Sequence, residues 1–196
     1  NDQIKLNSYY LDNKLFVNID VPTVEQRPPV DIVLCIDVSY SMYEPATLKG
    51  EQNESLNHGF SVLSLTVVAA KTILHSLNEN DNISIVTYSS EARTLLENVA
   101  CTAENKTVIE CELDTLKPIS NTNMWAGIHS SLDILRTTSP ANKMKGILLL
   151  TDGIPNVVPP RGHINMLEKY FRDHNFNCMF SCYGFGYNLE SKLLSE

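Results

Sequence analysis

VLCIDVSYSM, residues 33–42, joins a run of apolar side chains to an aspartate and two serines at alternate positions. The apolar run from Val30 to Asp37 predicts a short strand buried on both faces, as in a parallel sheet. Asp37, Ser39 and Ser41 therefore stand where a buried strand ends, which is where α/β sheets bind ligands. Because Asp and Ser also cap helices, this segment taken alone supports a helix cap as well as a ligand site.

Two further segments carry side-chain oxygens at positions of the same kind. GILLLT, residues 146–151, predicts a second buried strand, and Asp152 follows it directly. SNTNMWAG, residues 120–127, places Thr122 at an accessible helix start. A turn explains Asp152 alone and a helix cap explains Thr122 alone. Together the three segments bring two carboxylates and three hydroxyls to one predicted crevice.

Strands and helices alternate along the chain, which predicts an α/β fold with a doubly wound, mostly parallel sheet and helices on both faces. An antiparallel strand over 93–99 lies at its edge, and residues 14–21 form an additional N-terminal strand. We predict the other strands over 30–37, 83–88, 146–151 and 178–185. We predict helices over 61–77, 103–116, 123–136, 164–173 and 189–195. Residues 42–60 read as a long polar loop.

Composition narrows the classes of partner and compartment. The net charge of −8, with no basic stripe, argues against nucleic acid and acidic membrane surfaces. No apolar run is long enough to span a bilayer, and the N-terminal residues do not resemble a signal peptide. The five cysteines show no metal-binding spacing, so we expect reduced thiols and a cytoplasmic protein. Three N-glycosylation sequons keep an extracellular location as the alternative, although composition alone yields roughly three.

The oxygen set matches the ligand preference of a hard divalent cation. Mg²⁺ takes oxygen ligands in octahedral geometry, and Mn²⁺ or Ca²⁺ are alternatives. Two carboxylates balance the charge of the ion, and the hydroxyls add neutral ligands without filling its shell. We therefore expect the cation to accept one more anionic oxygen, from a Glu or Asp of a partner protein. The segments 42–60 and 156–163 should rim this site.

DVSYSM (37–42), NTNMWAGI (121–128) and LLLTDG (148–153) together resemble the three motif segments of von Willebrand factor A domains. The resemblance implies a metal-ion-dependent adhesion site in a protein-binding module that is not an enzyme. It implies five metal ligands: Asp37, Ser39, Ser41, Thr122 and Asp152. Tyr40 and Asn121 stand where the family often has glycine. The implied domain covers 30–196 and is cut short before its last strand, and 1–29 form the N-terminal strand and linker.

A finer resemblance rests on TDGIPNVVPPRGH (151–163) and YGFGYNLESKLL (183–194). These segments are similar to the version of the domain in large intracellular eukaryotic proteins that also carry a U-box and a hedgehog/intein-like module. The alternative function is therefore a structural domain of a larger, ubiquitin-related protein, with metal used only for stability. An enzyme is disfavoured because Ser39 has no identifiable base, and because Asp37 lacks the second acid of a phosphoryl-transfer site.

Overall fold

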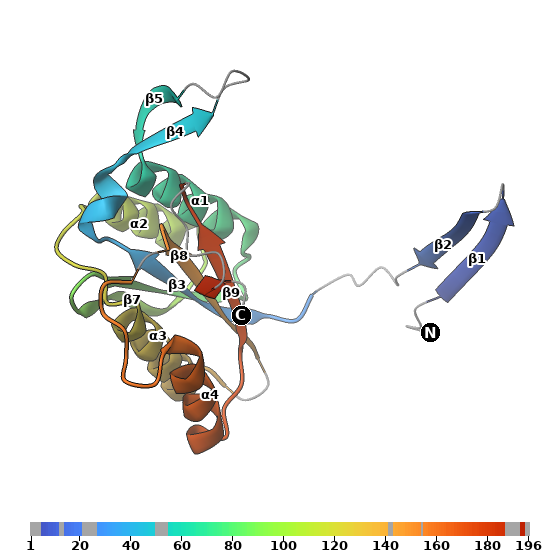
Figure 1. Ribbon diagram of the computed structural model, residues 1–196. Helices are drawn as coiled ribbons and strands as arrows, with labels where there is room; N and C mark the ends of the chain where they lie inside the picture. The colour runs from blue at the N-terminus through green and yellow to red at the C-terminus, as the bar shows by residue number, and fades with distance from the viewer. Residues whose placement is uncertain are drawn as a thin grey trace.

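A five-stranded sheet forms the centre of the protein, in a computed structural model that describes residues 5–11, 14–20, 27–49, 55–140, 143–153, 155–186 and 193–194 (Figure 1). The strand order is β7-β6-β3-β8-β9, and every neighbouring pair is parallel except β6 with β7. The strands are β3 (Val30–Asp37), β6 (Asn82–Tyr88), β7 (Ala92–Ala100), β8 (Met144–Thr151) and β9 (Met179–Gly184). The predicted sheet, with its antiparallel edge strand, is confirmed.

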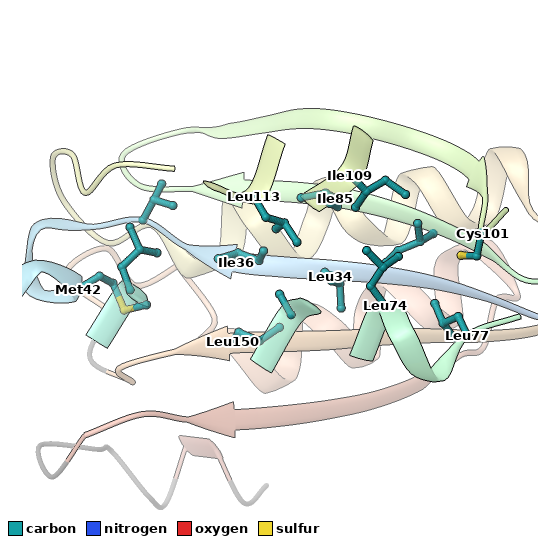
Figure 2. Packing of buried hydrophobic residues seen from close by; sticks show 14 of the residues in the cluster. Leu34, Ile36, Met42, Leu74, Leu77, Ile85, Cys101, Ile109, Leu113 and Leu150 are labelled. Carbon is teal, nitrogen blue, oxygen red and sulfur yellow. The ribbon is translucent and has the colours of Figure 1, made fainter. Parts of the chain in front are cut away.

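Helices cover both faces of this sheet, as the alternating pattern predicts (Figure 1). α1 (Val62–Ser76) and α2 (Ala103–Asp114) lie on one face, and α3 (Met124–Thr138) and α4 (His163–His174) on the other. Alternate side chains of β3 divide between the two cores, because successive residues of a strand point to opposite faces. Leu34 and Ile36 face α1 and α2 (Figure 2), whereas Val33 and Cys35 face α3 and α4.

The polar loop expected over 42–60 is wrong. A short 3₁₀ helix, η1 (Tyr40–Tyr43), is followed by an antiparallel hairpin of β4 (Pro45–Lys49) and β5 (Ser55–Ser61). Figure 1 shows this hairpin extending from the end of the sheet beyond α1. The sequence does not predict these two strands, because their largely polar residues lack the alternation of apolar and polar positions that is the main signal for a strand.

The N-terminal region has one strand more than expected. β2 (Lys14–Asp20) matches the predicted strand, and β1 (Lys5–Leu11) pairs with it antiparallel. Arg27 then forms an ion pair with Asp81, whose carboxylate also accepts the Val30 N–H at 3.0 Å. The hydrogen bond from the Val30 N–H to Asp81 fixes the start of β3. Of the helix expected over 189–195, only 193–194 lie within the described residues. In that described part, none of the helices is long and apolar enough to cross a membrane.

The contact between α3 and the sheet depends on Gly127. A Cβ atom at this position would lie 2.5 Å from the Tyr88 ring and 2.9 Å from Cys35 Sγ. Both neighbours are fully buried on central strands, so neither can move aside easily. Glycine therefore allows the helix to pack directly against β3 and β6, and this packing holds Tyr88 in place.

We expect Gly127→Ala to lower the free energy of unfolding by about 1–2 kcal/mol, although alanine is the better helix former by about 1 kcal/mol. The reason is overpacking against Tyr88. Gly146→Ala is the matched control, because its Cβ would meet only the Met179 carbonyl at 3.9 Å. Urea unfolding of both variants tests this, and equal effects of the two substitutions would contradict it.

All five cysteines have free thiols in the structure. Burial raises the pKa of Cys35 to about 12 and that of Cys101 and Cys178 to about 11. Cys111 is exposed on α2. Iodoacetamide without reductant should therefore label Cys111 rapidly in the native protein, the half-buried Cys178 and Cys182 more slowly, and the buried Cys35 and Cys101 only after unfolding. Mass spectrometry of the labelled protein measures this, and recovery of an intact Cys101–Cys111 disulfide would refute it.

Candidate metal centre

The carboxyl ends of β3 and β8 meet at the point where the chain changes direction across the sheet. From β3 the chain passes through α1 to β6 on one side, whereas β8 lies on the other side. Ile36 pairs with Leu150, so Asp37 and Thr151 are the next residues on adjacent strands. Crevices at such positions are where doubly wound sheets bind ligands.

Asp37 is fully buried at the end of β3. One carboxylate oxygen accepts the Ser39 N–H at 2.8 Å. The other accepts the hydroxyls of Thr151 at 2.8 Å and Tyr88 at 3.1 Å. Burial raises the pKa of this carboxyl, and the donors oppose that effect only in part. These hydrogen bonds thus hold the side chain in one position, although removing its charge from water is unfavourable.

Ser39 and Ser41 are placed by η1. Ser39 occupies the N-cap position of this 3₁₀ helix, but its side chain makes no capping hydrogen bond. Its hydroxyl oxygen instead lies 3.1 Å from that of Ser41. A helix cap therefore does not explain these serines, and two hydroxyl oxygens face the same space beside Asp37.

Thr122 differs from its expected environment. It is buried, only 3% exposed, so the accessible position expected for it is wrong. Asn123 caps α3 in its place, because its side-chain oxygen accepts the Ala126 N–H at 3.2 Å. The Thr122 N–H donates to the side-chain oxygen of Asn156 at 3.1 Å. The Thr122 hydroxyl therefore does not cap α3, although the sequence suggested that role.

Asp152 carries the least satisfied oxygen of the set. Its Oδ1 atom is buried and has no hydrogen-bond partner among the described residues. Burial raises the pKa of this carboxyl, the Ser41 hydroxyl opposes that shift, and the negative charges of Asp37 and Glu44 add to it. Burying a carboxylate oxygen without a hydrogen-bond donor raises the free energy of the folded state. A cation or a proton bound to this atom would lower it again.

Backbone hydrogen bonds tie together the three segments that carry these side chains. The first and second are joined by the Tyr40 N–H to the Ser120 carbonyl at 3.1 Å, and by the Ile119 N–H to the Val38 carbonyl at 2.6 Å. The Thr122 carbonyl accepts the N–H groups of Asn156 at 3.0 Å and Val157 at 3.2 Å, which joins the second to the third. These bonds fix the three segments relative to one another and so preorganise the site.

The donor set fits a hard divalent cation. Every predicted ligand offers oxygen, which Mg²⁺, Mn²⁺ and Ca²⁺ prefer over nitrogen or sulfur. Within the described residues no group of three or more His, Cys, Asp and Glu side chains could hold a metal by itself. A cation here would thus depend on hydroxyl ligands as well as on Asp37 and Asp152. It would also offset the repulsion between these two carboxylates.

The sequence patterns do not identify three residues whose side chains position the site through hydrogen bonds. Tyr88 ends β6, Thr151 ends β8, and Asn156 lies in the loop after β8. Thr151 stands within the TDG segment next to Asp152, so its position was a usable signal. Tyr88 reads as an ordinary apolar residue of a buried strand. Its hydroxyl reaches Asp37 only because the parallel register places the two residues opposite each other.

A family model for the von Willebrand factor type A domain matches residues 32–154, which include all five predicted ligands. The chain belongs to the von Willebrand factor type A (VWA) family. A solved VWA structure from Catenulispora acidiphila agrees in fold, with a TM-score of 0.64, 18% identity and coverage of 92% of this chain and 37% of that one. Domains of this family are typically protein-interaction modules and are generally not enzymes.

Two curated proteins are similar over most of this VWA chain. The uncharacterized protein YfbK of Escherichia coli (strain K12) is 29% identical over 147 residues, which are 74% of the chain. Inter-alpha-trypsin inhibitor heavy chain H2 of Sus scrofa is 27% identical over 163 residues, or 80% of the chain. The chain spans 23% of the first protein and 16% of the second, so each has a large part outside the shared region.

The raised pKa of Asp37 predicts how the stability of the metal-free domain depends on pH. Because the pKa of Asp37 is higher in the folded state than in the unfolded state, the folded state binds more protons at pH values between these two pKa values. Stability contributed by this carboxyl is present below the unfolded pKa and is lost as pH rises through the folded pKa. In EDTA, the advantage of Asp37→Asn over the wild type should therefore grow with pH across that window.

Urea unfolding at a series of pH values measures this difference. An Asp37→Asn profile parallel to that of the wild type would show that burial of the charge is not costly.

Proposed function

We propose that this VWA domain is a non-enzymatic binding module that captures a Glu or Asp of a partner protein through Mg²⁺. Asp37, Ser39, Ser41, Thr122 and Asp152 would hold the ion. The observation that carries the proposal is the buried Asp152 Oδ1, which has no hydrogen-bond donor among the described residues, in a site whose other groups offer only oxygens. Membership of the VWA family supports the same role for the domain.

Charge balance favours a carboxylate as the bound group. Asp37 and Asp152 together match the charge of a divalent ion, and the three hydroxyls add none. When bound, Mg²⁺ would supply an open coordination position for one further oxygen, because it tends to keep exchangeable waters. A single Glu or Asp side chain suits that position. The hydrogen bonds that Asp37 accepts from Ser39 and Thr151 fix the orientation of its carboxylate.

The proposed compartment is the cytoplasm, and the five free thiols support it. The competing function is a structural domain of a larger protein in which the same oxygens only brace the crevice. Asp37 gives that alternative a specific basis, since its bonds to Tyr88 and Thr151 join three strands without a metal. Metal affinity and stability must therefore be measured separately.

Thr122→Ala should separate the two functions. We expect it to weaken Mg²⁺ binding at least about tenfold, as loss of a group that positions metal typically does. The melting temperature should change little, because Asn123 rather than Thr122 caps α3. Thr66→Ala is the matched control: this buried threonine on α1 donates to the Val62 carbonyl at 3.0 Å, so its loss should reduce stability and leave Mg²⁺ affinity unchanged.

Calorimetric titration of metal-stripped protein with Mg²⁺, together with melting curves of each variant, provides both readouts. No binding by the wild type at millimolar Mg²⁺ would contradict the proposed function. If Thr122→Ala destabilised the fold as Thr66→Ala does and left Mg²⁺ affinity unchanged, the structural alternative would be supported.

A further inference from the structure

Exposed apolar side chains lie on or close to the three segments that carry the predicted metal ligands, and four of them are tied to these segments through η1 or through backbone hydrogen bonds. Tyr40 is 70% and Tyr43 74% exposed on η1, Ile119 is 54% exposed just before the second segment, and Val157 is 43% exposed after the third. We call these four residues the apolar rim. Single exposed apolar residues are ordinary on protein surfaces, but a set gathered around one site indicates an interface.

The two tyrosines are held outward by the geometry of η1. A 3₁₀ helix has three residues per turn, so side chains three apart lie on the same face. Tyr40 and Tyr43 therefore share the solvent side of η1. Met42, between them, is fully buried and packs in the core beneath α1 (Figure 2). Because Met42 anchors this turn, the tyrosines stand beside Ser41 as fixed features of the surface.

Ile119 and Val157 are fixed by backbone hydrogen bonds to the site itself. The Ile119 N–H donates to the carbonyl of Val38, next to Ser39, at 2.6 Å. The Val157 N–H donates to the carbonyl of Thr122 at 3.2 Å. Backbone hydrogen bonds thus hold these exposed apolar residues in place relative to the predicted ligands. A partner that binds them would therefore not incur the entropic cost of ordering a loop.

The chemistry of the rim limits what can occupy it. None of its four side chains is charged. Glu44 follows Tyr43, Lys117 lies two residues before Ile119, and the whole chain carries a net charge of −8. This net charge would repel a partner with several acidic residues in sequence, whereas a single acid can bind the cation. Apolar side chains beside a single acid avoid that repulsion, and tyrosine rings offer them large contacts at low entropic cost.

We propose that the apolar rim binds apolar side chains that flank the metal-bound carboxylate of a protein partner, so the recognised element is one acid next to apolar residues. The proposal rests on the proposed function, because the acid must reach the metal for its neighbours to reach the rim. It adds to that function a sequence preference that the metal alone cannot supply.

Selection from random peptides displayed on phage, each carrying one fixed central glutamate, tests this with a defined probe. In Mg²⁺, peptides enriched on the wild-type domain should carry apolar residues beside the glutamate, and EDTA should abolish their binding. With a synthetic peptide of the enriched sequence, Tyr40→Ser combined with Tyr43→Ser should weaken binding about tenfold or more, as loss of interface hot spots does. Selection on this double variant should still depend on Mg²⁺ but lose the apolar preference.

The matched controls are exposed apolar residues away from the site. Tyr9→Ser on β1 replaces a tyrosine that is 58% exposed, and Val108→Ser on α2 matches Ile119→Ser with 57% exposure. Both should leave peptide affinity unchanged, whereas Ile119→Ser should lower it. Equal melting temperatures of the double variant and the wild type would confirm that the loss is not one of folding.

The outcomes separate the rim from the metal site. Mg²⁺-dependent peptides without an apolar preference, or unchanged affinity in the double variant, would overturn the rim and leave the proposed function standing. Apolar peptides that bind equally in EDTA would overturn the coupling between rim and metal. If no glutamate peptide is enriched in Mg²⁺, the proposed function and the rim both fail.

Discussion

The buried carboxylate of Asp37 is the constraint on which the rest of the site depends. Its two oxygens accept hydrogen bonds from Ser39 on its own strand end, from Tyr88 on β6 and from Thr151 on β8. One side chain therefore joins three adjacent strands at their carboxyl ends. An acid in this position opposes folding through its desolvation, which is more typical of a functional group than of one that stabilises the fold.

The packing beneath the site serves the same arrangement. Gly127 lets α3 approach β3 and β6 closely enough to enclose the Tyr88 ring, and the enclosed ring directs its hydroxyl to Asp37. Asn123 caps α3 one residue after Thr122, so the start of the helix and the ligand segment are positioned together without competing for one side chain. The core and the segments that carry the five predicted ligands are thus parts of one rigid framework, as a precisely positioned binding site requires.

The surface around the crevice has a different origin from the crevice itself. The oxygens come from the ends of regular elements, whereas the apolar rim comes from η1 and two connecting segments that hydrogen-bond to them. Connecting segments can change without disturbing the sheet, because they contribute little to the core. The domain belongs to a family whose members are typically interaction modules, and variable connecting segments around a fixed sheet suit that role.

The sequence by itself determined the order of the buried strands and helices and the antiparallel edge strand, and it singled out five oxygen side chains as candidate metal ligands. These follow from local patterns: apolar runs mark buried strands, helical periodicity marks the helices, and polar residues directly after a strand mark its end. Tertiary structure alone decided that Asn123, and not Thr122, caps α3, that Tyr88 reaches Asp37, and that residues 45–61 form a hairpin. Each of these depends on which groups meet across the fold, through hydrogen bonds between residues far apart in the chain, and no local periodicity records such a meeting.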